Sequence, residues 1–141
     1  MRKILFLIIF ISLSFSREHI AVIDFESINI DKGEAKALTN RVTSVLIDID
    51  EYTVLERSEM KKLLDEQKLQ DVLCFDTKCA VKIGKMIGAK YIVVGSISKV
   101  GNTYSADSRL INVETGESYG SGNFSHTGEI DYLLTEGMKS V

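Results

Sequence analysis

The residue types that most often carry out chemistry in proteins are few in this chain and do not cluster. The two histidines, His19 and His126, lie far apart in the sequence, and neither has neighbours that would complete a zinc site or a nucleophile and base pair. No predicted strand is followed by a glycine-rich loop of the kind that binds phosphate groups. The sequence therefore predicts no catalytic residue, no bound metal and no cofactor, and we expect the protein not to be an enzyme.

Two carboxylates, Asp24 and Glu26, stand near the carboxyl end of a predicted strand. Open α/β sheets often place ligand-binding groups at that position. Carboxylates there also cap the next turn or pair with a basic side chain. We favour this structural role for both residues.

The two cysteines, Cys74 and Cys79, are separated by four residues. This spacing differs from the C-x-x-C redox motif, and a second pair of zinc ligands is lacking. In an exported protein we expect a structural disulfide between them. The alternative is a reactive thiolate at a helix N-terminus, which would make the protein a thiol oxidoreductase.

Residues 1–16 have the pattern of a secretory signal peptide. A short basic head precedes an almost wholly apolar run over residues 4–13, and the small residues Ser14 and Ser16 occupy the positions that a signal peptidase recognises. The apolar run is shorter than the roughly 20 residues that span a bilayer. Cleavage after Ser16 would remove 16 of the 141 residues and leave a single domain of 125, residues 17–141.

Charge and cysteine placement indicate where the mature protein works. The chain has 17 basic and 20 acidic residues, and loss of Arg2 and Lys3 with the leader changes its formal charge from −3 to −5. An acidic protein is a poor partner for nucleic acid. Because no cysteine follows the leader closely, we expect no lipid anchor, and no membrane span remains after cleavage. The expected location is the periplasm or the exterior of the cell.

The predicted centre of the fold is an unbroken apolar strand over residues 91–94. Two further strands are expected over residues 103–113 and 118–126, with turns at Gly101 and Gly116 between the three. This order predicts a β-meander. In its second strand, one face should carry Tyr104, Ala106, Ser108 and Leu110.

The first half of the chain predicts a β-α-β unit. Residues 19–26 and 52–55 are expected to be strands, and a helix over residues 31–48 lies between them, with Asp31 and Glu34 as a capping box.

Two helices should follow before the meander. We expect Ser58 to cap the first, Asp76 or Thr77 to cap the second, and Gly88 to end it. The complete order predicts a single domain of the α/β (α+β) class. Its five-stranded mixed sheet would have a C-terminal β-meander and helices packed mainly on one face, in a strand order that the sequence leaves open.

A last helix carries an apolar stripe at helical spacing. The stripe consists of Ile130, Leu133, Leu134 and Met138, with Val141 at its end. In one alternative the stripe packs on the chain's own meander, over Leu110 and Phe124. In the other it docks onto a partner protein or a second subunit.

Several stretches, in this order and spacing, resemble the CsgG-type domain family. They are residues 20–26 (IAVIDFE), 52–60 (YTVLERSEM), 79–85 (CAVKIGK), 88–96 (GAKYIVVGS), 99–104 (KVGNTY) and 109–117 (RLINVETGE). The resemblance implies a bacterial cell-envelope protein similar to the periplasmic part of the curli secretion channel. It also implies similarity to LpoB-type activators of penicillin-binding proteins and to the N-terminal domains of TolB-like proteins. Members of this group are binding and assembly modules without catalytic residues.

Three functions follow from these observations. The first is an exported, non-enzymatic binding or assembly module that interacts with an envelope protein complex. The second is a subunit of a ring-forming secretion or transport assembly, in which copies of the chain associate. The third, which we favour least, is a thiol oxidoreductase that uses Cys74 and Cys79.

Overall fold

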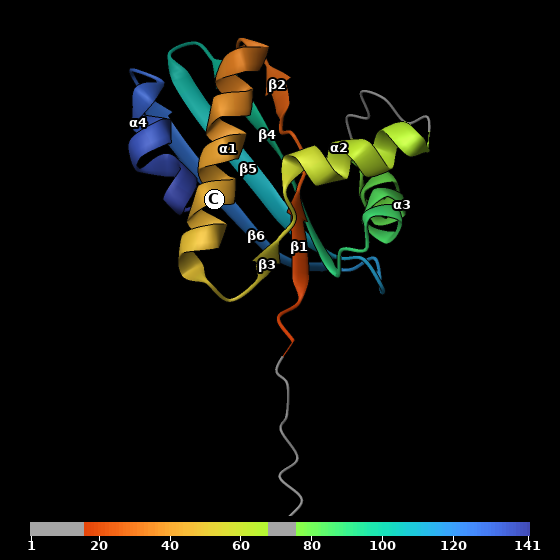
Figure 1. Ribbon diagram of the computed structural model, residues 1–141. Coiled ribbons are helices and arrows are strands. Elements are labelled where there is room, and N and C mark those ends of the chain that lie inside the picture. Colours follow the sequence, from red (N-terminus) through yellow and green to blue (C-terminus); the bar gives the residue numbers. More distant parts are fainter. Residues whose placement is uncertain (1–15, 68–75) are drawn as a thin grey trace, which may run out of the picture.

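A mixed six-stranded sheet forms the centre of the protein (Figure 1). The computed structural model describes residues 16–67 and 76–141. The strands are β1 (His19–Val22), β2 (Glu26–Ile28), β3 (Thr53–Val54), β4 (Tyr91–Val100), β5 (Thr103–Asn112) and β6 (Ser118–Thr127). The helices are α1 (Lys32–Ile49), α2 (Arg57–Glu66), α3 (Thr77–Ile87), α4 (Asp131–Thr135) and the 3₁₀ helix η1 (Gly137–Lys139). Among these helices, none has the length and apolar composition needed to cross a bilayer.

The sheet has a parallel half and an antiparallel half. Its order is β3-β1-β4-β5-β6, and β2 pairs with β4 beyond the end of β1. β4 is parallel to β1 and β2, whereas β4, β5 and β6 form the predicted antiparallel meander. The turns at Gly101 and Gly116 have the positive φ angles, 59° and 74°, that favour glycine there. The predicted fold class is therefore confirmed.

The helices cover both faces of the sheet, which differs from our expectation of one covered face. Successive residues of β1 alternate between two cores, with Ile20 and Val22 packed in the core under α1 and Ala21 in the core under α3. α4 and η1 share the first core, and α2 shares the second. Strands in a parallel arrangement are usually buried on both faces, so a layer of helices is needed on each side.

The predicted strand over residues 19–26 is interrupted, which accounts for the sixth strand. Val22 at the end of β1 lies opposite Val93, and Glu26 at the start of β2 lies opposite Ser96. Three residues separate Val22 from Glu26, whereas only two separate Val93 from Ser96 on β4. The extra residue acts as a β-bulge and shifts the alternation of side chains. Phe25 consequently enters the α1 core, and Glu26 lies on the face of the sheet that carries α2 and α3.

Distant side chains hold this bulge in place. The carboxylate of Asp24 pairs with the guanidinium of Arg57 at the start of α2. The backbone N–H of Phe25 donates to the buried hydroxyl of Thr39 in α1 over 3.1 Å. This ion pair agrees with the structural role that we expected for Asp24.

The helix ends follow the predicted signals with one exception. Asp31 and Glu34 form the expected capping box of α1, and Asp76 caps α3 by accepting from the N–H of Cys79 over 2.9 Å. α2 begins at Arg57, one residue before the expected cap Ser58, and the preceding Glu56 makes no side-chain capping bond.

The C-terminal segment packs on the chain's own sheet. It forms α4 and η1 instead of one continuous helix, and Leu133 and Met138 are buried in the core under α1. Ile130 packs against the same core, whereas Leu134 remains 42% exposed. A Cβ on Gly137 would lie only 2.8 Å from Cδ1 of Phe124, which shows how closely the segment approaches β6.

Three of the four candidate docking residues therefore lie against the chain's own core. This placement corresponds to the intramolecular alternative, because buried side chains are not available to a partner. A docking role for the stripe would require the segment to leave the sheet.

Candidate functional site

Half of one sheet face is polar, and none of the helices in the described residues lies over it (Figure 1). On the side of α2 and α3, the part of the sheet next to α3 is apolar and buried through Ile92, Val94 and Ile111. Toward the β4–β5 turn, the same face carries mostly hydroxyl, amide and charged groups. We call this surface the open face, and its residues are Glu26, Ile28, Ser96, Ser98, Val100, Thr103, Ser105, Asp107, Arg109, Ser121, Asn123, Ser125 and Thr127.

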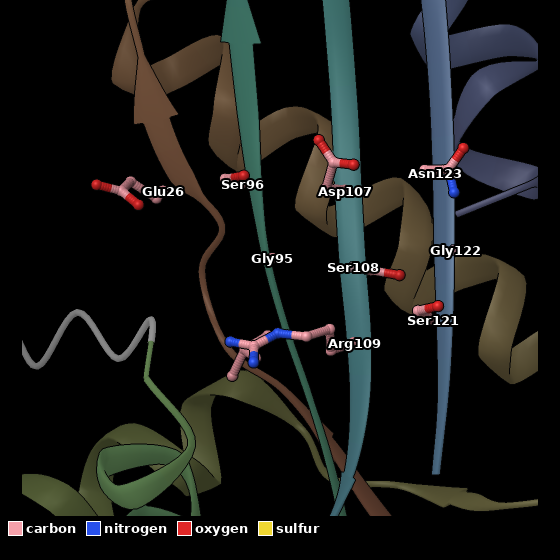
Figure 2. Close-up of a pocket in the computed structure, with 10 residues that line it drawn as sticks. Glu26, Gly95, Ser96, Asp107, Ser108, Arg109, Ser121, Gly122 and Asn123 are labelled. Atoms are coloured by element: carbon pink, nitrogen blue, oxygen red, sulfur yellow. The ribbon is translucent and has the colours of Figure 1, made fainter. Parts of the chain in front are cut away.

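Four strands place polar side chains of the open face in one row (Figure 2). The pairing of neighbouring strands fixes the order of this row. From one edge to the other it runs Glu26 on β2, Ser96 on β4, Asp107 on β5 and Asn123 on β6. Neighbouring strands lie about 4.8 Å apart, so the row extends over four regularly spaced positions. These residues line a pocket of about 330 Å³, and Arg109 reaches from β5 toward β4 at its lower side.

Hydroxyl pairs continue the polar surface toward the β4–β5 turn. Thr103 and Thr127 share a hydrogen bond of 2.9 Å across β5 and β6, and Ser105 and Ser125 share one of 3.0 Å. The hydroxyl of Ser105 also donates to Asp107 over 3.4 Å. The open face can therefore offer a partner both donors and acceptors on a rigid strand framework.

Tyrosines form a second surface on the α1 side of the sheet. We call Tyr52, Tyr91 and Tyr119 the tyrosine row. The ring centroids of Tyr52 and Tyr91 are 5.7 Å apart in an edge-to-face arrangement, and those of Tyr91 and Tyr119 are 5.6 Å apart. Tyr119 is 69% exposed. Rows of partly exposed tyrosine are typical of protein interfaces, because the ring supplies apolar area and the hydroxyl supplies a hydrogen bond.

A lysine and acidic groups adjoin the tyrosine row. Nζ of Lys90 lies 5.7 Å from the Tyr91 ring centroid and donates to Oε1 of Glu18 over 2.7 Å. That hydrogen bond is the main reason why the pKa of Lys90 is raised. Burial, with smaller contributions from Tyr91 and Glu51, raises the pKa of Tyr52.

The cysteines and histidines that were considered in the sequence lie outside the open face and the tyrosine row or outside the described residues. Cys74 lies outside the described residues, and Cys79 lies in the first turns of α3, so their pairing stays a prediction. His126 stacks on Tyr132 with 4.3 Å between ring centroids, and His19 is at the exposed start of β1. Within residues 16–67 and 76–141, no group of three or more histidine, cysteine or carboxylate side chains could hold a metal ion.

The tyrosine row was not predicted from the sequence. Its members are far apart along the chain and become neighbours only through the pairing of β1 with β3 and β4 and of β5 with β6. The serines of the meander do not all share one face: Ser105, Ser121 and Ser125 lie on the open face, whereas Ser108 lies on the other face and is buried. The contribution of Glu26 to the open face depends on the bulge after β1.

The sequence profile described as "Curli production assembly/transport component CsgG" matches residues 16–123. The chain belongs to the CsgG family. A search of curated protein sequences found no significant match for this CsgG-family protein.

Solved structures share the fold of this CsgG-family protein. The LpoB C-terminal domain from Escherichia coli is 22% identical with a TM-score of 0.66, and the match covers 79% of this chain and 83% of that domain. Lipoprotein GNA1162 from Neisseria meningitidis is 17% identical with a TM-score of 0.60, covering 79% and 81%. PelC from Paraburkholderia phytofirmans, described as a dodecamer, is 14% identical with a TM-score of 0.55, covering 89% and 81%. At these identities the likeness shows a shared fold.

Proposed function

We propose that this CsgG-family protein is a non-enzymatic module of the cell envelope that binds another envelope protein. The observation that carries the proposal is the open face, an ordered polar surface over which the described part of the chain places no helix. Family membership supports an envelope role, as does the fold shared with an LpoB domain and with a lipoprotein. The partner would be held by hydrogen bonds and ion pairs to side chains on rigid strands, with little conformational entropy lost by the module itself.

The proposal includes export to the periplasm or the cell exterior, with cleavage after Ser16. The mature protein would begin at Arg17 and carry no lipid. Mass spectrometry of protein purified from its native cells tests this part. An intact leader or a lipid adduct would contradict it.

Charge reversal on the open face tests the binding surface. Asp107 is exposed and lies in the middle of the polar row, so Asp107→Arg should repel or misalign a partner without disturbing the core. We expect crosslinked cell envelopes to yield a captured protein with the wild-type chain and much less of it with the variant. Lys36→Glu, a charge reversal at an exposed position on α1, is the matched control and should retain capture. Equal capture by all three proteins would show that the open face is not the binding surface.

A second candidate function is a subunit of a ring-forming assembly. Among the strands of the described residues, β6 pairs with β5 alone, and its ten residues include no aspartate, glutamate, lysine, arginine or proline. Long edge strands without such residues readily pair with another chain. The PelC structure that shares this fold is described as a dodecamer. Sedimentation analysis of the mature protein separates the two candidates, because a ring requires a discrete species of several subunits.

A further inference from the structure

We propose that two copies of this chain pair through β6, edge to edge and antiparallel, so that their two sheets become one. The twofold axis passes beside Asn123, which lies opposite the same residue of the second copy. A twofold contact closes on itself and yields a dimer, unlike the head-to-tail contact that a ring requires. The inference therefore goes beyond both candidate functions and names the occupant of the β6 edge.

The two edges of the sheet differ in how they are protected. On one side the outer strands are β3, with two residues, and β2, with three. Very short edge strands are a common protection against pairing with another chain. β6 on the other side has ten residues without charge or proline, and its irregular pairing with β5 is confined to its first residues, opposite Leu110 and Ile111. Residues 121–127 thus form a regular edge without the usual protective residues.

The backbone of β6 directs every second residue toward this edge. At the end of the strand, the N–H of Gly128 donates to the carbonyl of Asn102 over 3.0 Å. In an antiparallel pair, residues that exchange hydrogen bonds with the partner strand alternate with residues whose N–H and C=O groups point away from it. The residues of β6 that point away from β5 are therefore Ser121, Asn123, Ser125 and Thr127, which are all exposed.

This alternation restricts how β6 can pair with a copy of itself. Odd-numbered residues must lie opposite odd-numbered residues, because only they direct backbone groups toward the second copy. With Asn123 opposite itself, Phe124 and His126 lie opposite Gly122 and Gly120 of the second copy. An aromatic ring opposite a glycine packs over the exposed backbone and offsets the low strand propensity of glycine. β6 is thus complementary to itself in hydrogen bonding and in side-chain size.

Gly120 is not required by the packing of its own chain. Its φ angle lies outside the left-handed region, and apart from its chain neighbours no described residue has a heavy atom within 4 Å of where its Cβ would be. A Cβ on Gly122, by contrast, would lie 2.5 Å from the carbonyl carbon of Val141. The open space beside Gly120 is where the His126 ring of the second copy would lie.

The open-face side of β6 also suits a second copy. Ser121 would lie opposite Ser125, and cross-strand hydroxyl pairs of this kind stabilise sheets. Ser105 and Ser125 already form such a pair between β5 and β6, with 3.0 Å between their oxygens. No like charges meet, because β6 carries none. Opposite residues of a sheet project from the same face, so the two open faces would form one surface.

Sedimentation equilibrium of the mature protein tests the pairing. At about 0.1 mM, where a dissociation constant of about 10 μM leaves most chains paired, the wild type should be a dimer. Asn123→Lys should raise the dissociation constant about fivefold or more, because like charges directly opposite each other on neighbouring strands are destabilising. Asn40→Lys makes the same change at an exposed position on α1 and should leave the dimer unchanged. A monomeric wild type, a ring, or equal dissociation constants for both variants would overturn the inference.

Crosslinking tests the register. In a background of Cys74→Ser and Cys79→Ser, Asn123→Cys should form a disulfide-linked dimer when copper phenanthroline is added, whereas Asn40→Cys should not. Opposite residues that exchange hydrogen bonds have Cα atoms about 5.5 Å apart, which a disulfide can span. A dimer that Asn123→Cys fails to crosslink would show that the copies meet elsewhere and would overturn the inference.

One variant separates this inference from the proposed function. Asp107 lies on β5, away from the β6 edge, so Asp107→Arg should sediment as a dimer even where it captures less envelope protein. Loss of the dimer in Asp107→Arg would contradict the β6 contact. A wild-type monomer that still captures its partner would overturn this inference alone and leave the proposed function standing.

Discussion

At the scale of single residues, Thr39 determines how the chain passes from β1 to β2. Its side chain is fully buried in α1, where its hydroxyl donates to the carbonyl of Ala35 over 2.8 Å. The same oxygen accepts from the N–H of Phe25, which has left the sheet ladder at the bulge. A β-bulge in the middle of the fold is thus stabilised by one hydroxyl from a helix.

We predict that Thr39→Val lowers the free energy of unfolding by about 1–3 kcal/mol. Valine fills the same volume but leaves the Phe25 N–H without an acceptor, and an unsatisfied buried donor costs about that much. Urea denaturation of the mature protein measures the change. Thr39→Ser keeps the hydroxyl and is the control, with a smaller loss due to the missing methyl group. Equal stability of the valine and serine variants would show that the hydrogen bond contributes little.

A second prediction at this scale concerns the two cysteines. We expect Cys74 and Cys79 to form a disulfide, because the protein is proposed to be exported and disulfides persist outside the cytoplasm. The closed loop is short, so reduction should cost only about 2 kcal/mol of stability. Mass spectrometry after alkylation without reductant should detect no modified cysteine. Two modified thiols in protein isolated from the native cells would instead favour the oxidoreductase alternative.

Among the elements, the C-terminal segment shows that an apolar stripe in the sequence need not be exposed to a partner in the fold. Leu133 and Leu134 are adjacent in the sequence, and both belong to the predicted stripe. In the fold, Leu133 is fully buried in the α1 core, whereas Leu134 is 42% exposed. The short α4 turns the first inward and leaves the second at the surface.

We predict that Leu133→Ala destabilises the domain by about 2–5 kcal/mol, as truncation of a buried leucine does. Leu134→Ala is the matched control and should change stability by no more than about 0.5 kcal/mol, the usual range at exposed positions. Thermal unfolding of both variants distinguishes the two packing alternatives. Similar melting temperatures for Leu133→Ala and the wild type would indicate that α4 is not held on the sheet in solution.

The elements that could be predicted are those specified by nearby residues. Asp31 and Glu34 identify the start of α1, Asp76 and Gly88 bound α3, and the turn glycines separate the strands of the meander. The bulge could not be predicted, because it depends on Arg57 and Thr39, which meet Asp24 and Phe25 only in the fold. The alternation of residues along β5 could be predicted, because Tyr104, Ala106, Ser108 and Leu110 do share one face, whereas the place of Glu26 on β2 depends on the bulge and could not.

In the molecule as a whole, Lys90, Lys99 and Tyr52 have raised pKa values, and each shift favours the protonated form. The pKa of Lys90 is raised above its ordinary value of 10.5 mainly by its hydrogen bond to Glu18, and that of Lys99 mainly by its hydrogen bond to Tyr104. The pKa of Tyr52 is raised above 10.0 mainly by burial. The folded state therefore holds these protons more strongly than the unfolded chain does.

We predict that stability decreases as the pH rises from about 9 to about 11. The contribution of Lys90 is complete below the pKa of the unfolded chain and is lost as the pH passes through the raised pKa of the folded state. Lys99 and Tyr52 act in the same direction. Urea midpoints across this range measure the effect, and Glu18→Gln should make the decrease smaller because it removes the main cause of the Lys90 shift. A midpoint that stays constant or increases would contradict the prediction.

The pairing of β1 with β4 also has a consequence for the order in which the chain can fold. Val22 lies opposite Val93, so the parallel half of the sheet closes only after some seventy intervening residues are available. β4, β5 and β6 are joined by short turns and need no such long loop to close. Contacts between residues near in sequence form faster, because less chain entropy is lost when they meet. We therefore expect the meander to form first and β1 to join it later, together with α1.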